Sequence, residues 1–168
     1  MARWGLKFAQ ESGESVGYSD MNTIDWPHEK IRSAALRYIA KHTLKESEWR
    51  FTCLDGLPER LVRIVQLNVN ERPIVTCFVD AQRWYAMTTR RIFGVFQGAR
   101  FSCSPLQVTR WQWGDFKHMG RSEVETATLA LADGTHIRVP YETGYAAMAP
   151  IYYERFWVVK HPALDRLE

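Results

Sequence analysis

The stretch from Pro73 to Pro140 constrains the fold of this chain more than any other part of the sequence. It divides into short segments rich in β-branched and aromatic residues, separated by turn residues at strand-like spacing. The segments are PIVTCFV (73–79), RWYAMTT (83–89), RIFGVFQ (91–97), PLQVTRWQW (105–113), DFKHM (115–119), EVETATLALA (123–132) and THIRVP (135–140). The pattern predicts about seven antiparallel strands.

Asp133-Gly134, between the last two segments, is the strongest turn signal in the chain. A two-residue hairpin loop of type I′ needs positive φ, which Gly adopts without steric cost. Pairing about such a loop puts Val124, Thr126, Thr128 and Ala130 on one face with Ile137 and Val139, and turns Leu129 and Leu131 to the other. Apolar side chains on both faces predict a closed or strongly bent sheet with another element packed on it.

An amphipathic helix is predicted at about 27–42, before the strands. Asp25-Trp26-Pro27 supplies a capping side chain and an early proline, both typical of a helix start. Apolar positions then recur at steps of three and four, at Ile31, Ala34, Ala35, Tyr38, Ile39 and His42. We expect this face to pack on the body of the protein.

A second amphipathic helix is predicted after Pro140 and ends before His161-Pro162. Its apolar face consists of Tyr141, Tyr145, Met148, Tyr152, Phe156 and Val159. Pro150 either kinks this helix or divides it in two.

The remaining N-terminal segments are less regular. Residues 1–24 are rich in Gly, Ser, Asp and Asn, which indicates a loose or edge-bound arm. Residues 49–54 are compatible with a short strand. Residues 58–68 fit either a helix, favoured by Pro58 in a first turn, or a strand, favoured by the β-branched residues.

Seven strands followed by a helix resemble the pleckstrin-homology-like (PH-like) domain, in particular its bacterial branch. The stretch YAMTTRRIF (85–93) matches an aromatic, a Thr and an Arg before an apolar strand, as in the second and third strands of such domains. NERPIV (70–75) is similar to their lead-in to the first strand, and Asp133-Gly134 to their final hairpin. The resemblance covers about residues 70–160.

This resemblance implies an α+β fold, with a seven-stranded antiparallel β-barrel or sandwich capped by a C-terminal helix. We therefore expect a PH-like barrel at 70–168, preceded by a small helical N-terminal extension at 1–69. Members that bind phosphoinositides carry several basic residues on the first two strands and the loop between them. Here VDAQRW (79–84) offers Arg83 beside Asp80, which disfavours lipid-head-group binding.

Composition limits the function classes further. The 168 residues suit one domain with a full core, and the net charge of +3 is low for a dedicated nucleic-acid binder. No apolar run reaches the roughly 18 residues of a membrane helix, and the start of the chain does not resemble an export signal. We expect a cytoplasmic protein with three reduced thiols, since Cys53, Cys77 and Cys103 form no C-x-x-C pair.

The sequence contains none of the common catalytic motifs: no H-E-x-x-H, G-x-S-x-G, Walker-type loop or G-x-G-x-x-G after a strand. The five His residues are scattered without metal-ligand spacing. Cys77 lies in the middle of a predicted strand, where a thiol is normally inert. We therefore predict no catalytic residues, no cofactor and no metal.

The candidate partner-binding residues fall in two places. In RWQWGDFK (110–117), Trp111 and Trp113 share one side of a regular strand, flanked by Arg110, Phe116 and Lys117. The tryptophans could be core residues or, since Trp, Tyr and Arg anchor many interfaces, an exposed binding surface. Arg90 and Arg91 are the second place. They fall in the predicted bend after Thr88-Thr89, where consecutive side chains diverge, so they make a poor joint phosphate clamp.

The leading functional hypothesis is a non-enzymatic bacterial module that binds another protein. One concrete form is an immunity protein, which neutralises a toxin from neighbouring bacteria by covering its active site. The alternative is a PH-like domain that binds a lipid head group or small ligand at a membrane surface. Nucleic acid ranks behind protein because of the low net charge.

Overall fold

The computed structural model describes residues 28–119 and 122–160. Its helices are α1 (His28–Ala40), α2 (Glu59–Val62) and α3 (Met148–Arg155), with short 3-10 turns η2 (Glu46–Glu48), η3 (Pro105–Gln107) and η4 (Gly144–Ala147) and a π-helical turn η5 (Phe156–Lys160). Its strands are β1 (Thr52–Leu54), β2 (Pro73–Asp80), β3 (Arg83–Thr88), β4 (Ile92–Phe96), β5 (Ala99–Cys103), β6 (Val108–Gln112), β7 (Val124–Leu131) and β8 (His136–Glu142).

The strands form two antiparallel sheets, with orders β1-β2-β3-β4-β5 and β6-β7-β8. The predicted α+β class and C-terminal helix are confirmed. The predicted closed seven-stranded barrel is not, because no strand of one sheet pairs with the other within the described residues. The sheets instead pack face to face, and apolar side chains from both meet in one core.

Seven strands follow Pro73, as predicted, but one of them is not where the sequence placed it. Residues 115–119 form turns, with Phe116 N–H donating to the Gly114 carbonyl at 2.8 Å and His118 in the left-handed region at φ 64°. The strand that was missed is β5. It pairs with β4 through Gln97-Gly98, whose φ values of 51° and 80° suit a two-residue type I′ loop. Gln seldom takes positive φ, so Gln97-Gly98 does not match the usual Asn-Gly or Asp-Gly signal of such a turn.

The β7–β8 hairpin is present at Asp133-Gly134, but its predicted register is wrong by one residue. The Gly134 N–H donates to the Leu131 carbonyl at 3.0 Å, and Gly134 has a φ of 86°. The loop is therefore a longer turn with a glycine bulge, and the extra residue exchanges the faces of one strand. Leu129 pairs with Ile137 and shares the buried face, contrary to the prediction.

The segment before Pro73 contributes three parts to the body. The predicted helix is present as α1, and Ile31, Ala35 and Ile39 are buried as its spacing indicated. β1 pairs with β2 at the edge of the larger sheet. Within 58–68 only α2 is regular, so this stretch is neither a full helix nor a strand. The predicted arm at 1–24 and the cap at 25–27 lie outside the described residues.

The C-terminal helix begins later than predicted and turns a different face inward. Tyr141 belongs to β8, and the helical segment runs from 3-10 through α to π geometry. The prediction assumed about 100° of rotation per residue throughout, but the number of residues per turn changes along this segment. As a result Tyr153 is fully buried, while Tyr152 is half-buried. Pro150 lies in the first turn of α3, where its missing N–H breaks no helical hydrogen bond.

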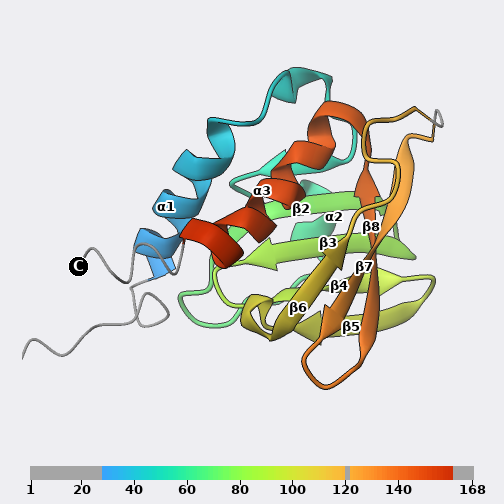
Figure 1. Ribbon diagram of the computed structural model, residues 1–168. Coiled ribbons are helices and arrows are strands. Elements are labelled where there is room, and N and C mark those ends of the chain that lie inside the picture. The colour runs from blue at the N-terminus through green and yellow to red at the C-terminus, as the bar shows by residue number, and fades with distance from the viewer. Residues whose placement is uncertain (1–27, 120–121, 161–168) are drawn as a thin grey trace, which may run out of the picture.

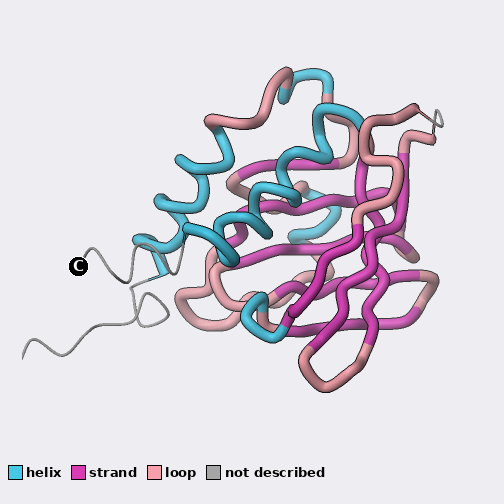
Figure 2. The backbone as a smooth tube through the Cα atoms, in the orientation of Figure 1, coloured by secondary structure: helices cyan, strands magenta, loops and turns pink. Residues whose placement is uncertain are grey.

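The larger sheet is covered on both faces (Figure 1). On one face α1 and α3 lie side by side with the smaller sheet, and Tyr85 and Met87 of β3 point into this main core. On the other face, Trp84 and Ala86 pack with Leu61 of α2 in a second cluster. Figure 2 shows the strands gathered on one side of the molecule and the two longer helices on the other.

Candidate functional site

A cleft of about 780 Å³ opens where η2, the loop after β6 and η4 with the start of α3 meet. Figure 1 shows η2 and the start of the C-terminal helical segment at the top of the molecule. We call this space the upper cleft. Its lining residues come from three segments that are far apart in the sequence: Glu48, Trp49, Arg50, Phe116, Lys117, His118, Glu123, Glu142, Thr143, Gly144, Tyr145, Ala146 and Met148. The volume is in the range of small-molecule sites.

The buried carboxylate of Glu142 holds two walls of the upper cleft together. It accepts hydrogen bonds from the backbone N–H groups of Arg50 at 2.7 Å, Phe51 at 3.0 Å and Thr52 at 2.8 Å. Glu142 is the last residue of β8, while its donors are the first residue of β1 and the two residues before it. Since the carboxylate is fully engaged by these donors, it serves as an anchor for the cleft.

His118 fixes the third wall. Its Nδ1 lies 2.6 Å from the Ser122 carbonyl oxygen and 2.8 Å from Thr143 Oγ1. A carbonyl oxygen can only accept, so Nδ1 carries the proton. Thr143 donates its own hydroxyl proton to the same Ser122 carbonyl at 2.6 Å. The loop after β6 is thereby tied to the start of the C-terminal helical segment.

Charged side chains at the upper cleft are largely neutralised by one another. Arg50 pairs with Glu123, and the ammonium of Lys45 lies 3.2 Å from Glu48. The same ammonium sits 5.0 Å from the ring centroid of Tyr145. The cleft therefore presents aromatic and apolar surface inside a rim of paired charges, the composition typical of protein interfaces.

Unusual backbone conformations gather around this cleft. Lys45 has a φ of 55°, His118 of 64° and Gly144 of 73°. For a residue with a Cβ, the left-handed region costs of order 1 kcal/mol and persists only where the surroundings hold it. A Cβ on Gly144 would meet nothing within 4 Å, so there is room for a side chain. The positive φ is what favours glycine at this position.

The structure separates the partner-binding candidates of residues 110–117 into two groups. Phe116 and Lys117 line the upper cleft, with the Lys117 ammonium 5.9 Å from the Phe116 ring centroid. Trp111, Trp113 and Arg110 do not line it. Arg110 is exposed on β6.

The two tryptophans are neither fully exposed nor fully buried. Trp111 and Trp113 are half-buried and stacked, with ring centroids 5.6 Å apart, and both pack against the main core. Trp113 also donates its indole N–H to Glu154 at 2.6 Å. Burial raises the pKa of the Glu154 carboxyl, despite this hydrogen bond. The pair mainly fastens α3 to the smaller sheet.

Arg91 has a structural role. Its guanidinium lies 3.0 Å from the carboxylate of Glu71, which is fully buried, and 4.1 Å from the Phe93 ring centroid. Glu71 also accepts from Thr88 Oγ1 at 2.6 Å. Burial opposes ionisation of Glu71, but its hydrogen bonds, that of Arg91 first, outweigh it and hold the pKa of the carboxyl below its usual value.

Arg90 lies on the other side of the same bend and is exposed. Its Nε donates to His28 Nε2 at 2.9 Å, so His28 is neutral there and donates Nδ1–H to Thr89 at 2.7 Å. Burial and then the charge of Arg90 lower the pKa of His28. The predicted divergence of Arg90 and Arg91 is therefore seen in their different partners.

Sequence reasoning missed most of the upper cleft. Trp49 and Tyr145 are among its aromatic lining residues, yet the first fell in an ambiguous segment and the second on a predicted helix face. Glu142 fell in the stretch after Pro140 that was predicted to be helical. The one available signal was the shift from strand to helix pattern after Pro140, which marks a chain corner but not a cleft.

The cysteines are poorly suited to nucleophilic chemistry. Burial raises the pKa of Cys77 to about 12 and that of Cys103 to about 11. Burial also raises the pKa of Cys53. In the parts of the chain that the structure describes, no group of three or more His, Cys, Asp or Glu side chains is placed to hold a metal ion, and no helix is long and apolar enough to cross a membrane.

No protein-family model, curated protein or solved structure matches this chain.

Proposed function

We propose that this protein is a non-enzymatic binding module and that the upper cleft receives an apolar or aromatic side chain of a protein partner. The observation that carries the proposal is the lining of the cleft, in which Trp49, Phe116, Tyr145 and Met148 surround the space while the charges are paired with one another. Aromatic anchors inside a polar rim are the usual centre of a protein interface.

The proposal includes a PH-like fold. Four consecutive strands, β2 to β5, share one sheet, the next three, β6 to β8, form another, and α3 follows. This order supports the resemblance of residues 70–160 to that family, with β1 as an added edge strand. Such folds serve many functions, so the functional proposal rests on the cleft alone.

A lipid-head-group site is the weaker alternative. Arg83, the first residue of β3, donates to Asp80 through Nε at 2.9 Å and Nη2 at 2.7 Å, so this cation is already paired. The upper cleft includes the carboxylates of Glu48, Glu123 and Glu142. Glu48 and Glu123 are paired with Lys45 and Arg50, so a phosphate would have to displace a carboxylate to reach either cation, which favours a protein segment over a phosphorylated head group.

An enzymatic role would need an activated group, and the thiols supply none. A neutral thiol is a poor nucleophile, and the raised pKa values of Cys53, Cys77 and Cys103 keep all three protonated near neutral pH. This supports a binding module over an enzyme.

Site-specific photo-crosslinking tests the proposal directly. A benzophenone amino acid at Tyr145, which is 49% exposed at the cleft, is compared with the same probe at Val69, which is 87% exposed and outside the cleft. We expect a discrete protein adduct in cells from position 145 that is absent from position 69. Equal crosslinking from both positions, or a small molecule recovered in place of a protein, would count against the proposal.

The immunity protein is the concrete form of this proposal, in the bacterial cytoplasm. It predicts that a toxin encoded beside this gene kills cells unless this protein is co-expressed. Tyr145→Arg should abolish protection, because the charge fills the apolar space, while Val69→Arg should preserve it. Protection by both variants would remove the cleft from the toxin interface.

A further inference from the structure

The two longer helices carry an uneven share of the charge. Residues 28–45 and 148–160 contain seven Lys or Arg and two Asp or Glu, although the whole chain has a net charge of only +3. The acidic members are already engaged: Glu29 pairs with Arg32, and Glu154 accepts from Trp113. The helical side of the molecule is thus strongly basic, and the remainder is close to neutral or acidic.

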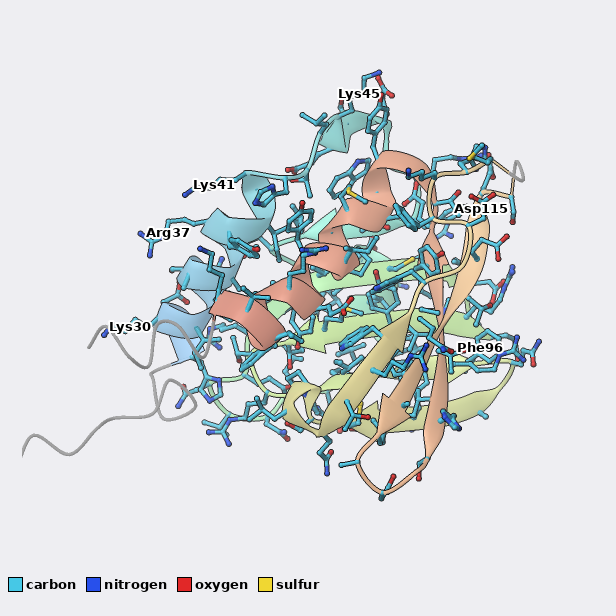
Figure 3. The ribbon with its side chains drawn as sticks, in the orientation of Figure 1. Lys30, Arg37, Lys41, Lys45, Phe96 and Asp115 are labelled. Carbon is cyan, nitrogen blue, oxygen red and sulfur yellow. The ribbon has the colours of Figure 1, made fainter. Side chains whose placement is uncertain are left out.

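Four of these cations lie exposed on α1, α3 and the residues that directly follow them: Arg37, Lys41, Arg155 and Lys160. We call them the basic helical face. Within the described part of the chain none of the four forms an ion pair. At 3.6 residues per turn, positions 30, 37 and 41 fall within about 40° of one another around the helix axis. Figure 3 shows Lys30, Arg37 and Lys41 projecting away from the sheets.

Contacts among the aromatic rings of Tyr38, His42 and Tyr152 join α1 to α3 next to these cations. His42 stacks on Tyr152 with ring centroids 4.0 Å apart, and Tyr38 meets Tyr152 edge-on at 5.8 Å. The Lys160 ammonium lies 5.5 Å from the Tyr38 centroid, and the Arg155 guanidinium 5.8 Å from that of Tyr152. Cation–π contacts restrict these side chains, so part of the entropy cost of binding is already met.

We infer that the basic helical face is a docking surface for an acidic face of a protein partner. The inference rests on the proposed function only in that the partner is a protein. The supporting observation is the charge: these four cations form no ion pair with any described residue, and they sit on two helices that pack on one core, so an acidic face would complement them. The surface steers and orients the partner, while the upper cleft takes its apolar anchor.

Protein fits this surface better than nucleic acid or lipid. The rings of Tyr38, His42 and Tyr152 already contact one another, so they are not open platforms for stacking bases. Among the described residues next to these cations in the chain, the large apolar side chains that are exposed are Leu44, Val158 and Val159. Stable membrane attachment normally needs a larger apolar insertion together with the charge.

The test uses the full chain, labelled with ¹⁵N, and three probes: poly-L-glutamate, phosphatidylserine vesicles and single-stranded DNA. We expect poly-L-glutamate to shift resonances of α1 and α3, with an affinity that falls as salt rises. The variant Arg37→Glu/Lys41→Glu/Arg155→Glu/Lys160→Glu should bind it at least about tenfold more weakly. The matched control, Arg60→Glu/Arg100→Glu/Arg110→Glu/Arg138→Glu, changes net charge equally at exposed sites elsewhere and should lose less than about threefold.

The outcomes separate the possibilities. Resonance shifts outside the helices, or equal weakening in both variants, would overturn the inference. Tighter binding of vesicles or DNA than of poly-L-glutamate would assign the face to that class of partner instead. Because mapping uses the unmodified protein, a variant that fails to fold does not prevent a decision. Crosslinking at Tyr145 is independent of these probes, so failure here leaves the cleft proposal standing, and the reverse also holds.

Discussion

Replacing Arg91 by Met removes the guanidinium that contacts the buried carboxylate of Glu71. Met retains much of the apolar length of the Arg side chain, so the change mainly removes the charge, together with the hydrogen bond from Arg91 Nη2 to the Gln66 carbonyl oxygen at 2.9 Å. Glu71 would keep its hydrogen bonds from Thr88 Oγ1 at 2.6 Å and from the Asn68 N–H at 2.8 Å. The carboxylate would nevertheless remain without the cation that offsets its burial.

The expected loss follows from the burial of the two partners. Breaking a fully buried ion pair by removing one partner costs about 3–5 kcal/mol. The side chain of Glu71 is 0% exposed but that of Arg91 is 27% exposed, so solvent already screens part of the interaction. With two hydrogen bonds remaining on Glu71, we expect a loss of about 2–3 kcal/mol in the free energy of unfolding.

Arg90 is the matched control, since it is the adjacent residue in the same bend but is exposed. Urea denaturation of the wild type, Arg91→Met and Arg90→Met at neutral pH gives the three free energies of unfolding. Arg90→Met should lose less than about 1 kcal/mol, because its hydrogen bond to His28 is at the surface. Equal losses in the two variants would refute the assignment of Arg91 to a buried pair.

The same pair makes a pH-dependent prediction. The pKa of Glu71 is lower in the folded protein than in the unfolded chain, so ionised Glu71 stabilises the fold above its unfolded pKa of about 4.3. This contribution is lost as pH falls through the lower folded pKa. The stability gap between wild type and Arg91→Met should therefore be widest near neutral pH and shrink in acid. A gap that stayed constant from neutral pH to strong acid would contradict this explanation.

Three further predictions test other parts of the structure. Glu154→Gln keeps an acceptor for Trp113 but removes a carboxyl whose pKa burial has raised, so Tm should rise by about 2 °C at neutral pH and not below about pH 4, measured by circular dichroism. Gly94→Ala places a Cβ 2.2 Å from a backbone carbonyl oxygen and should cost about 3 kcal/mol or more in urea denaturation, whereas Gly56→Ala, whose nearest atom is 4.0 Å away, should cost less than about 1 kcal/mol. Ellman's reagent should react slowly with half-buried Cys53 in the native protein and with the other two cysteines only on unfolding, and three fast-reacting native thiols would contradict their burial.

Local patterns predicted the kinds of elements well. The helix at α1 follows from apolar residues at steps of three and four, and its buried residues are those that the spacing selects. The bend at Thr88-Thr89 is also present, with Thr88 Oγ1 accepting from the N–H groups of Arg90 at 3.2 Å and Arg91 at 3.0 Å. These features depend on residues near one another in the chain, so the local sequence is enough to predict them.

Register and helix face were less predictable. One extra residue in the Asp133-Gly134 loop turned Leu129 from the predicted outer face to the core, because side chains alternate with a period of two. Likewise, the change from 3-10 to α to π geometry after Thr143 moved Tyr153 inward in place of Tyr152. In both cases the type of element was predicted correctly, but a small change in local backbone geometry altered which side chains face the core.

The sequence by itself determined the α+β class, the helix that follows the strands and the divergence of Arg90 from Arg91. Only the tertiary structure decided that Arg91 is a partner of a buried carboxylate and that Phe116 and Lys117 belong to a cleft while the tryptophans beside them do not. Glu142 shows the physical reason, since it binds the backbone of residues up to 92 positions away. Propensity and periodicity describe neighbours in the chain, whereas a binding site is made by segments that only the packed core brings together.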